Sequence, residues 1–375
     1  MAQFGISQPL LRLEDHDLLL GKGTFLDNQS FPGMAYGVAV RSPHAHAEIR
    51  SVDTAAAKAM PGVLAVYAPA DVADLGDIPT LAFPAMIEGT EHRHHGQPVL
   101  ARDRVRYAGQ CVAFVVAETL VQARDAAEAV MVDYDPLPAV TDPKQATRKG
   151  APQLWDDAPE NRSFEFELGD KAATDAGFAE AERVISLDVI NNRVILSAME
   201  TRGALGRYED GRYILHATTQ MPHRLKEQLA DKVFGVPRDN VRVLVGDVGG
   251  GFGGKNGLYA ENCLVLHAAR DLGRPVKWVS DRSEAFLSDT GGRDNVTTGE
   301  LATSVSAYVT HGVLSGGAVA RVEASPMEQL VITDSIQATE AVLAASNITP
   351  LTIAPLLGEA IKRIAEERSV SSLFD

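Results

Sequence analysis

The chain has 375 residues, of which 45% are hydrophobic and 23% charged, and its formal net charge is −15. This length allows two or three domains, and the composition is that of an ordinary folded protein. The negative charge disfavours a nucleic-acid-binding surface, which needs clustered lysine and arginine side chains. No apolar run reaches the roughly 18 to 20 residues that span a bilayer, and residues 1–10 lack the pattern of an export signal. We therefore expect a cytoplasmic protein with no membrane span and no nucleic-acid partner.

The predicted elements of the first domain, residues 1–142, alternate between short strands and short helices. Strands are expected at 35–40, 63–67, 111–117 and 130–134 because these runs are apolar and rich in β-branched residues. A helix over 55–60 is expected to have Thr54 as its cap and to end at Pro61-Gly62, and a second helix is expected from Leu120. The first domain is therefore predicted to be α/β.

A polar stretch over 142–161 is predicted to link this domain to a second one, residues 160–302. Strands are expected there at 184–196, 213–217 and 241–245, with a helix over 222–233. In residues 303–375, strands at 305–309, 330–332 and 351–353 are expected to alternate with helices near 338–345 and 358–366, as in a parallel α/β fragment. The predicted fold class is thus α/β and α+β, in several domains.

The two cysteines of the chain, Cys111 and Cys263, lie far apart in apolar segments. They exclude a disulfide framework and a cysteine-held iron-sulfur or zinc site. We expect both to be small core residues in a reducing compartment. The cluster of Glu91, His92, His94 and His95 could suggest a metal site, but adjacent histidines without a convergent further ligand are more typical of a solvated loop. No metal is therefore assigned to it.

The most informative motif is DVGGGFGGK at 247–255, placed between the strand 241–245 and a helix expected over 258–271. Its five consecutive or near-consecutive glycines remove every Cβ, so that backbone N–H groups could reach a phosphate or an oxo group. A dinucleotide fingerprint fits Gly249, Gly251 and Gly254, but no ribose-binding acid follows at the usual spacing. A P-loop would need Ser or Thr where Asn256 stands. A tight turn without a ligand would explain two glycines and hardly five.

Other motifs follow in a consistent order along the chain. They are LRLED at 11–15, GKGTFLD at 21–27, RSPHAHA at 41–47, PGV at 61–63, GQPVLA at 96–101, VRYAGQ at 105–110, AAEAV at 126–130, METRG at 199–203 and TQMPH at 219–223. With the glycine motif, residues from about 10 to 302 resemble the large subunit of the molybdenum hydroxylases, the family of xanthine dehydrogenase, aldehyde oxidase and carbon monoxide dehydrogenase. The resemblance implies a hammerhead-type α/β domain followed by the N-terminal part of a molybdopterin-binding domain.

The resemblance also implies a cofactor, partners and site residues. In this family a molybdenum-molybdopterin cofactor, for which the cytosine dinucleotide form is plausible here, hydroxylates a small-molecule substrate with oxygen from water, and electrons leave through iron-sulfur and FAD subunits. By resemblance, Gln220 would donate to an oxo ligand, Phe252 would line the substrate side, and the N–H groups of Gly250, Gly251 and Gly253 would approach the cofactor. Alternatively, Gln220 is a polar residue at a helix start and Phe252 belongs to the core.

The substrate and the base are less well defined by the resemblance. Asn256 follows Lys255 where the purine-oxidising branch has an acid, so xanthine is disfavoured and aldehydes, aromatic heterocycles or carbon monoxide remain. The catalytic glutamate and most pterin contacts of the family lie beyond the point where the resemblance stops. No general base is therefore assigned, and Glu200 and Glu261 are expected to be structural. We expect a truncated molybdopterin-binding subunit that is inactive alone.

Residues 303–375 resemble a different family. The segments TSVSAYVTHGVLSGGA at 303–318, VITDSI at 331–336, IAPLLGEAI at 353–361 and SVSSLF at 369–374 are similar to the C-terminal end of ribose-phosphate pyrophosphokinase. The resemblance implies a phosphoribosyltransferase-like fragment without the acidic loop that such a kinase needs for catalysis. It also makes residual anion binding by Ser369, Ser371 and Phe374 conceivable. The alternatives to an oxidoreductase subunit are thus a kinase-like transferase or a non-catalytic fusion product.

Overall fold

The computed structural model of the chain describes residues 12–80, 93, 95–181, 183–302, 307–309, 311–325, 327 and 329–365. The described residues divide into two compact units. The first unit comprises residues up to Glu167 together with Asn191–Asn295, and the second comprises Leu168–Ile190 together with the residues from Val296 onward. Each unit has its own sheets and its own core, and we describe each by itself.

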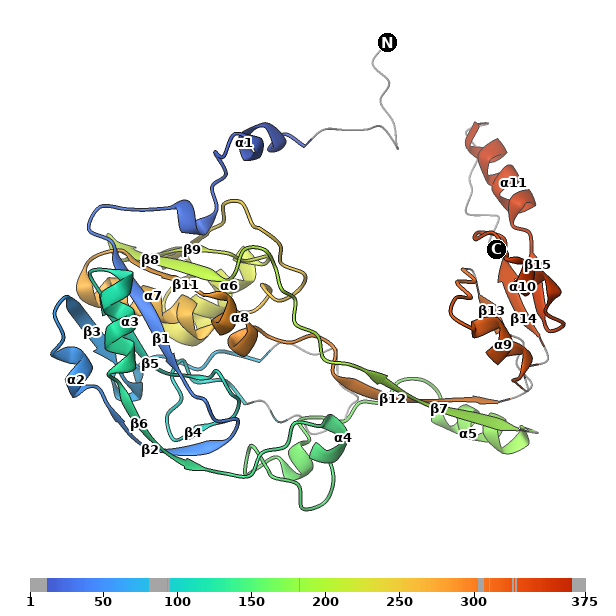
Figure 1. Cartoon of the computed structure of the whole chain (residues 1–375), viewed down its shortest axis with the longest axis horizontal. Helices are drawn as coiled ribbons and strands as arrows, with labels where there is room; N and C mark the ends of the chain where they lie inside the picture. Colours follow the sequence, from blue (N-terminus) through green and yellow to red (C-terminus); the bar gives the residue numbers. More distant parts are fainter. Residues whose placement is uncertain are drawn as a thin grey trace, which may run out of the picture. The chain divides into compact units, whose positions relative to one another are not determined.

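A mixed sheet of seven strands forms the centre of the first unit, in the order β10-β9-β8-β11-β1-β5-β3 (Figure 1). The strands are β1 (Ala35–Arg41), β3 (Val63–Tyr67), β5 (Cys111–Ala117), β8 (Gly203–Glu209), β9 (Arg212–Ala217), β10 (Val241–Leu244) and β11 (Val276–Val279). Two pairs, β1 with β11 and β9 with β10, are parallel, and the other neighbours are antiparallel. The pairing of β1 with β11 joins strands of the first and second predicted domains in one sheet.

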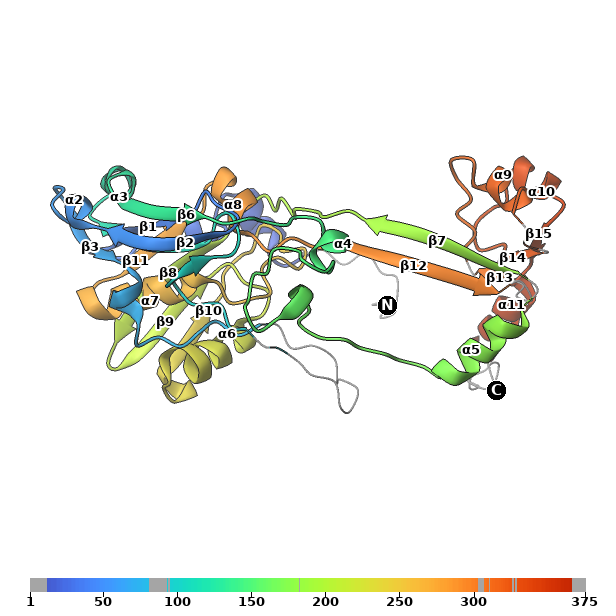
Figure 2. The same ribbon diagram turned by 90° about the horizontal axis from the view of Figure 1, so that it is seen from below.

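Side-chain alternation along β5 explains why helices cover both faces of this sheet. Ala113 and Val115 belong to a cluster with residues of α2 and α3, whereas Phe114 and Val116 belong to the cluster that contains α7. Figure 2 shows α2 and α3 on one side of the strands and α6 and α7 on the other. The helices of this unit are α1 (Asp15–Leu19), α2 (Ala55–Lys58), α3 (Leu120–Glu128), α4 (Pro143–Ala146), α6 (Pro222–Gln228), α7 (Ala260–Leu272) and α8 (Arg282–Ser288).

A smaller antiparallel sheet completes the first unit. Its strands run in the order β4-β2-β6, with bounds Ala47–Asp53 (β2), Arg104–Val105 (β4) and Met131–Pro136 (β6). Its buried cluster includes Ala47, Ala101 and Val105, which pack against Val112 of β5. The small sheet is therefore attached to the large one through a strand that is buried on both of its faces.

The second unit contains a three-stranded parallel sheet in the order β13-β14-β15 and a ribbon of two strands, β12 and β7. Leu330, Ile332, Val342 and Ile348 form the buried cluster of the parallel sheet. The bounds are Lys171–Glu180 (α5), Val184–Asn191 (β7), Asn295–Ala302 (β12), Ala307–Val309 (β13), Ala318–Glu323 (α9), Leu330–Thr333 (β14), Glu340–Ala344 (α10), Ile348–Leu351 (β15) and Ala354–Ala365 (α11).

Several predicted elements require correction. The strand predicted at 351–353 is wrong, because β15 ends at Leu351 and Ala354 begins α11, where Pro355 suits a first helical turn that needs no N–H donor. Thr54 occupies the N-cap position of α2 but makes no side-chain cap bond, and Asp53 instead accepts a hydrogen bond from the N–H of Ala55 at 2.9 Å. The helix predicted over 222–233 is α6 followed by a π-helical turn, Leu229–Phe234. The predicted domain boundaries at 142, 160 and 303 stay predictions.

Among the helices that the structure describes, none has both the length and the apolar character needed to cross a bilayer. Both cysteines are free and buried in the main core cluster, which confirms that they are core residues. Burial raises the pKa of Cys111 to about 12, so its thiol is neutral at ordinary pH.

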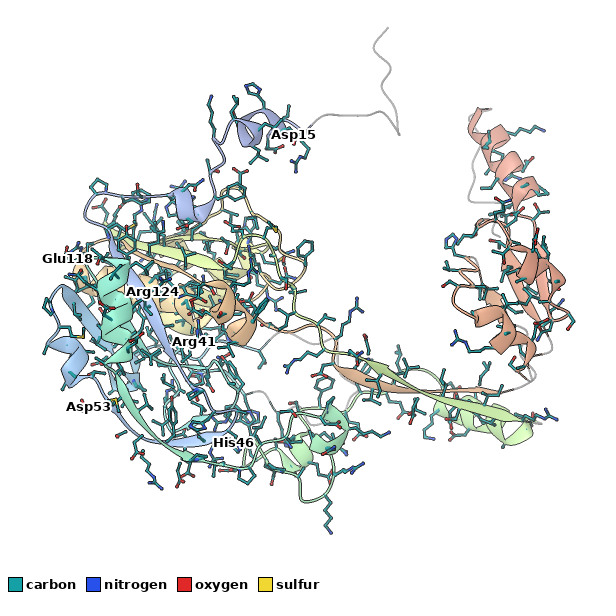
Figure 3. The ribbon with its side chains drawn as sticks, in the orientation of Figure 1. Asp15, Arg41, His46, Asp53, Glu118 and Arg124 are labelled. Carbon is teal, nitrogen blue, oxygen red and sulfur yellow. The ribbon has the colours of Figure 1, made fainter. Side chains whose placement is uncertain are left out.

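A buried charge cluster, the Arg41–Glu261–Arg202 triad, connects the elements of the first unit. Glu261 of α7 is 2% exposed, and each of its carboxylate oxygens binds one guanidinium: Oε1 accepts from Arg41, and Oε2 accepts from Arg202 at 3.0 Å. Figure 3 labels Arg41, which stands at the end of β1. The triad thus ties β1, α7 and the segment before β8 together through groups separated by up to 220 residues.

Each arginine of the triad also binds a second carboxylate. Arg202 also donates from Nε to Asp289 at 2.6 Å, and Arg41 donates from Nε to Glu284 at 2.8 Å. Burial alone raises the pKa of Glu261, but the charges and hydrogen bonds of Arg202 and Arg41 outweigh burial and lower this pKa to about 2. Because its partners offset the large desolvation cost, removing Glu261 leaves two buried guanidinium groups with only one carboxylate partner each, Glu284 for Arg41 and Asp289 for Arg202.

We expect Glu261→Gln to destabilise the first unit by about 3–5 kcal/mol, the usual cost of breaking a buried ion pair. Trp155 and Trp278, the two tryptophans, both lie in this unit, so urea unfolding followed by tryptophan fluorescence measures its stability. Glu118→Gln is the matched control, because Glu118 forms a surface pair with Arg274 and such pairs are worth about 0–1 kcal/mol. Equal losses in the two variants would contradict a central role for the triad.

The triad also predicts a direction for pH dependence. The pKa of Glu261 is depressed in the folded chain, so its stabilising contribution is complete above the ordinary value of 4.5 and is lost as pH falls toward about 2. The difference in unfolding free energy between the parent chain and Glu261→Gln should therefore shrink between pH 4.5 and the lowest pH at which the chain stays folded. A difference that is constant or grows over this interval would show that Glu261 is not charged in the fold.

Candidate functional site

The glycine loop, residues 249–255, lies between β10 and α7. The strand ends at Leu244 and the helix begins at Ala260, so the four residues 256–259 separate Lys255 from the helix. The N–H groups of the loop are consequently separate from the first turn of α7. The helix over 258–271 was predicted two residues too early, and the loop presents its backbone without the help of the helix dipole.

At each of the five positions, either the backbone conformation or a close neighbour favours glycine over a residue with a side chain. Gly250 and Gly253 have φ of +98° and +91°, which side-chain-bearing residues rarely adopt. A Cβ on Gly249, Gly251 or Gly254 would collide with the side chain of Glu200, Gln220 or Leu196, respectively. Neighbouring side chains thus offer a structural reason for glycine at these positions as well, so the glycine count alone does not indicate a ligand.

The ammonium group of Lys255 is buried on the inner side of the loop. It donates to the backbone oxygen of Glu200 at 2.9 Å and to Oε2 of Glu200 at 3.2 Å, and its side chain is 4% exposed. Burial lowers the pKa of Lys255, and the charge of Glu200 offsets only part of this effect. A P-loop lysine must reach a bound phosphate, so this placement argues against a P-loop.

The side chain of Gln220 lies against the glycine loop. Its backbone N–H donates to the carbonyl of Lys255 at 2.9 Å, and its Oε1 accepts from the N–H of Gly253 at 3.1 Å. A backbone N–H can only donate, so the carboxamide oxygen must face Gly253 and the NH₂ group must face away. Met221, not Gln220, is the N-cap of α6, and no side chain caps this helix. The interpretation of Gln220 as a helix-start residue is therefore not supported.

Several donors of this site have no acceptor within the described part of the chain. They are Nε2 of Gln220 and the N–H groups of Gly250, Gly251 and Phe252. In contrast, the N–H of Gly253 is occupied by Gln220, and the N–H of Gly254 donates to Gly251 at 2.8 Å. Gln220, Gly250 and Gly251 thus present hydrogen-bond donors to the site. Gly253 instead uses its N–H to orient the side-chain amide of Gln220.

Phe252 is an exposed aromatic residue on a strained backbone. Its φ is +46°, and 69% of its surface is exposed, so its interpretation as a core residue is wrong. A bulky residue in the left-handed region costs on the order of 1–3 kcal/mol and persists only where the surroundings enforce it. Such strain without a packing benefit is typical of functional sites.

The other predicted site residues lie elsewhere or outside the described residues. His95 stacks on Trp155, with ring centroids 4.3 Å apart, and its Nε2 lies 2.8 Å from Asp157. Glu91, His92 and His94 lie outside the described residues, as do Ser369, Ser371 and Phe374. Within the described ranges, no group of three or more histidine, cysteine, aspartate or glutamate side chains could hold a metal ion.

Tyr259 was missed by the sequence analysis. Its hydroxyl donates to the carbonyl of Gly254 at 2.5 Å, and the guanidinium of Arg202 lies 3.6 Å above its ring. It therefore connects the buried triad to the glycine loop. Nothing in the local pattern could have indicated this, because Arg202 lies 57 residues away in sequence and meets Tyr259 only in the fold.

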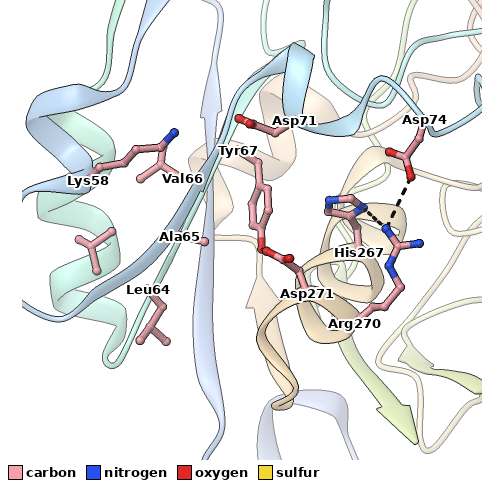
Figure 4. Close-up of a pocket in the computed structure, with 11 residues that line it drawn as sticks. Lys58, Leu64, Ala65, Val66, Tyr67, Asp71, Asp74, His267, Arg270 and Asp271 are labelled. Atoms are coloured by element: carbon pink, nitrogen blue, oxygen red, sulfur yellow. Dashed lines mark hydrogen bonds and ion pairs between the residues drawn. The ribbon is translucent and has the colours of Figure 1, made fainter. Parts of the chain in front are cut away.

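A cavity of about 540 Å³ lies at β3, an edge strand of the large sheet (Figure 4), and no residue of the glycine loop lines it. The hydroxyl of Tyr67 donates to Oδ2 of Asp271 at 2.8 Å. Nη2 of Arg270 lies 3.4 Å from Nδ1 of His267 and 3.6 Å from Oδ2 of Asp74. None of the predicted site residues lines this cavity, and these charged groups are paired with one another. The glycine loop remains the candidate site.

Two family models match the chain. Residues 20–138 match the a/b hammerhead domain of aldehyde oxidase and xanthine dehydrogenase, and residues 154–337 match the molybdopterin cofactor-binding domain. These matches confirm the hammerhead domain and the partial molybdopterin-binding domain. The predicted phosphoribosyltransferase-like fold of residues 303–375 stays a prediction.

Relatives and solved structures agree with the family models. The carbon monoxide dehydrogenase large chain of Afipia carboxidovorans is 40% identical over 308 residues, which are 78% of this chain and 36% of the relative. The nicotine 6-hydroxylase large subunit of Paenarthrobacter nicotinovorans is 36% identical over 84% of this chain and 38% of its own length. The structure of CO dehydrogenase from Oligotropha carboxidovorans matches with a TM-score of 0.71 at 39% identity, over 78% of this chain and 37% of the other.

A second, shorter likeness involves 74 residues. The ribose-phosphate pyrophosphokinase of Mesorhizobium japonicum is 68% identical over this segment, which makes up 20% of this chain and 24% of the kinase. The chain thus spans little more than a third of the large subunits that it matches and a quarter of the kinase. From the matched domains and the relatives we conclude that the chain belongs to the molybdenum hydroxylase large-subunit family and carries in addition a segment similar to ribose-phosphate pyrophosphokinase.

Proposed function

We propose that the glycine loop and Gln220 form one wall of a molybdenum-molybdopterin site in a subunit of a molybdenum hydroxylase. The observation that carries this proposal is the orientation of Gln220, whose amide NH₂ is left available because Gly253 holds its oxygen. The N–H groups of Gly250 and Gly251 have no acceptor among the described residues and would supply further donors. Gly253 would serve the site by holding Gln220.

The chemistry of these donors suits the proposed cofactor. All are uncharged dipoles, and the ammonium of Lys255, the cation within the loop itself, is held at Glu200. Neutral donors stabilise electron-rich oxo and phosphate oxygens without neutralising them. When bound, the cofactor would supply the redox chemistry that adds water-derived oxygen to a substrate carbon, while the residues of this chain would orient the cofactor and exclude water from one side.

We propose a small substrate beside Phe252, whose exposed ring would line the substrate side of the pocket. Asn256 gives no negative charge next to Lys255, which favours an aldehyde, an aromatic heterocycle or carbon monoxide over xanthine. The relatives include enzymes named for carbon monoxide, for nicotine and, among solved structures, for quinoline. We also propose the cytosine dinucleotide form of the cofactor, iron-sulfur and FAD subunits as partners, and a cytoplasmic location.

The segment similar to ribose-phosphate pyrophosphokinase does not lead us to propose a transferase activity. The likeness covers 24% of the kinase, and the acidic catalytic loop expected upstream of Thr303 has no counterpart in the sequence. Anion binding by Ser369, Ser371 and Phe374 stays a prediction, and a non-catalytic fusion product stays the alternative to an oxidoreductase subunit.

The orientation of Gln220 can be tested by substitution. Titration of the full chain with isolated cofactor, followed by pterin fluorescence, should give Gln220→Ala an affinity about 10- to 150-fold lower than that of the parent, because one hydrogen bond to a charged partner is worth about 1.5–3 kcal/mol. Gln220→Glu should bind still more weakly, because a carboxylate would repel the anionic oxygens. Gln145→Glu is the matched control: it adds the same charge on the exposed surface of α4 and should leave the cofactor affinity unchanged. If Gln220→Glu bound as tightly as the parent, Gln220 would not be a donor to the cofactor.

The activity of the isolated chain gives a second test. Because the family's remaining pterin contacts and its general base are not assigned in this chain, we expect it to carry far less than one molybdenum per chain after expression in a host that makes the cofactor. We also expect no aldehyde oxidation and no phosphoribosyl pyrophosphate synthesis. Metal analysis by mass spectrometry and the two activity assays check this. Stoichiometric molybdenum together with turnover of an aldehyde would contradict the expectation.

A further inference from the structure

Glu200 binds both ends of the glycine loop. Its Oε2 accepts from the N–H of Gly249 at 2.8 Å and lies 3.2 Å from Nζ of Lys255. Its backbone takes part as well, because its N–H donates to Gly249 at 3.0 Å and its carbonyl accepts from Lys255 at 2.9 Å. One residue therefore holds the first and the last residue of the loop.

The ion pair between Glu200 and Lys255 is largely buried, so solvent screens it less than a surface pair. The side chain of Glu200 is 15% exposed and that of Lys255 is 4% exposed. A Cβ on Gly249 would collide with Glu200, so the glycine is required for this close approach. Both partners of Oε2 are donors, and one of them is the ammonium of Lys255, so a carboxylate gives this position a charge-assisted contact that a neutral side chain would lack.

The loop end that Glu200 holds is also the point at which Gln220 is attached. The carbonyl of Lys255 accepts from the N–H of Gln220 at 2.9 Å and from the hydroxyl of Thr219 at 3.1 Å. Gln220 then accepts from Gly253 through its side chain. A displacement of Lys255 would therefore change the backbone of Gln220 and the contact between Gln220 and Gly253 together.

We propose that Glu200 is a positioning residue that closes the glycine loop and thereby sets the orientation of the Gln220 amide. This role extends the structural one expected from the sequence, and its relevance to a cofactor rests on the proposed function. Glu200 itself would not touch the cofactor. Its effect would pass through Lys255 to Gln220, and through Gly249 to the free N–H groups of Gly250 and Gly251.

The proposal is tested by amide hydrogen exchange in the full chain without cofactor, resolved to single residues by fragmentation mass spectrometry. The informative amide is that of Gly253, because it donates to Gln220 and makes no contact with Glu200. In Glu200→Gln, exchange at Gly253 should become roughly tenfold faster or more, because the loop opens locally without unfolding of the unit. A purely local role of Glu200 would change Gly249 alone.

Two further variants separate positioning from stability. Val66→Ala removes a buried methyl pair in β3, on another part of the sheet, and should lower the urea midpoint without selective change at Gly253. The double variant Glu200→Gln/Lys255→Met contains no unpaired buried charge at this position, so it should regain stability relative to Glu200→Gln while Gly253 still exchanges rapidly. This double variant keeps the test decisive if Glu200→Gln alone does not fold.

Exchange at Gly253 that stays within about twofold of the parent in the double variant would overturn the proposal, and so would an unprotected Gly253 in the parent chain. The outcome is independent of cofactor affinity. If Gly253 responds as expected but Gln220→Glu leaves pterin binding unchanged, the positioning role of Glu200 stands and the proposed function fails.

Discussion

The Arg41–Glu261–Arg202 triad is the interaction on which the arrangement of the first unit depends. A fully buried carboxylate is tolerated there because both of its oxygens meet a guanidinium. The triad joins β1, from the hammerhead segment, to α7 and the start of β8, from the molybdopterin-binding segment. Arg202 then lies over Tyr259, which binds the glycine loop at Gly254. The central sheet and the candidate site are thus connected through one chain of charged and aromatic contacts.

The glycine loop has structural reasons for its composition that are independent of any ligand. Left-handed backbone favours glycine at two positions, and close neighbours leave little room for a side chain at three others. What distinguishes the loop from an ordinary turn is its set of oriented donors and the exposed, strained Phe252. Recognition of an anionic cofactor would then depend on the few groups that the internal packing of the loop leaves without acceptors.

The sequence predicted the elements whose patterns are local. The strand β5 was predicted with its full extent because all seven of its residues are apolar, and the parallel pairing in the second unit was expected from its alternating elements. Contacts between distant residues could not be predicted: Arg41 and Glu261 are 220 residues apart, and nothing near either of them indicates the other. The burial of Lys255 against Glu200 was missed for the same reason, because a lysine after glycines looks locally like a phosphate ligand.

The proposed function requires that the oriented Gln220 amide, together with the N–H groups of Gly250 and Gly251 that have no acceptor among the described residues, contacts a molybdopterin cofactor. An NMR titration tests this contact: the chain is labelled with nitrogen-15 at glutamine and glycine, and its amide resonances are followed while isolated cofactor is added. The account predicts that the side-chain amide of Gln220 and the backbone amides of Gly250 and Gly251 shift together, while that of Gln145 stays in place. Binding of the cofactor with no change at Gln220, Gly250 or Gly251 would contradict it.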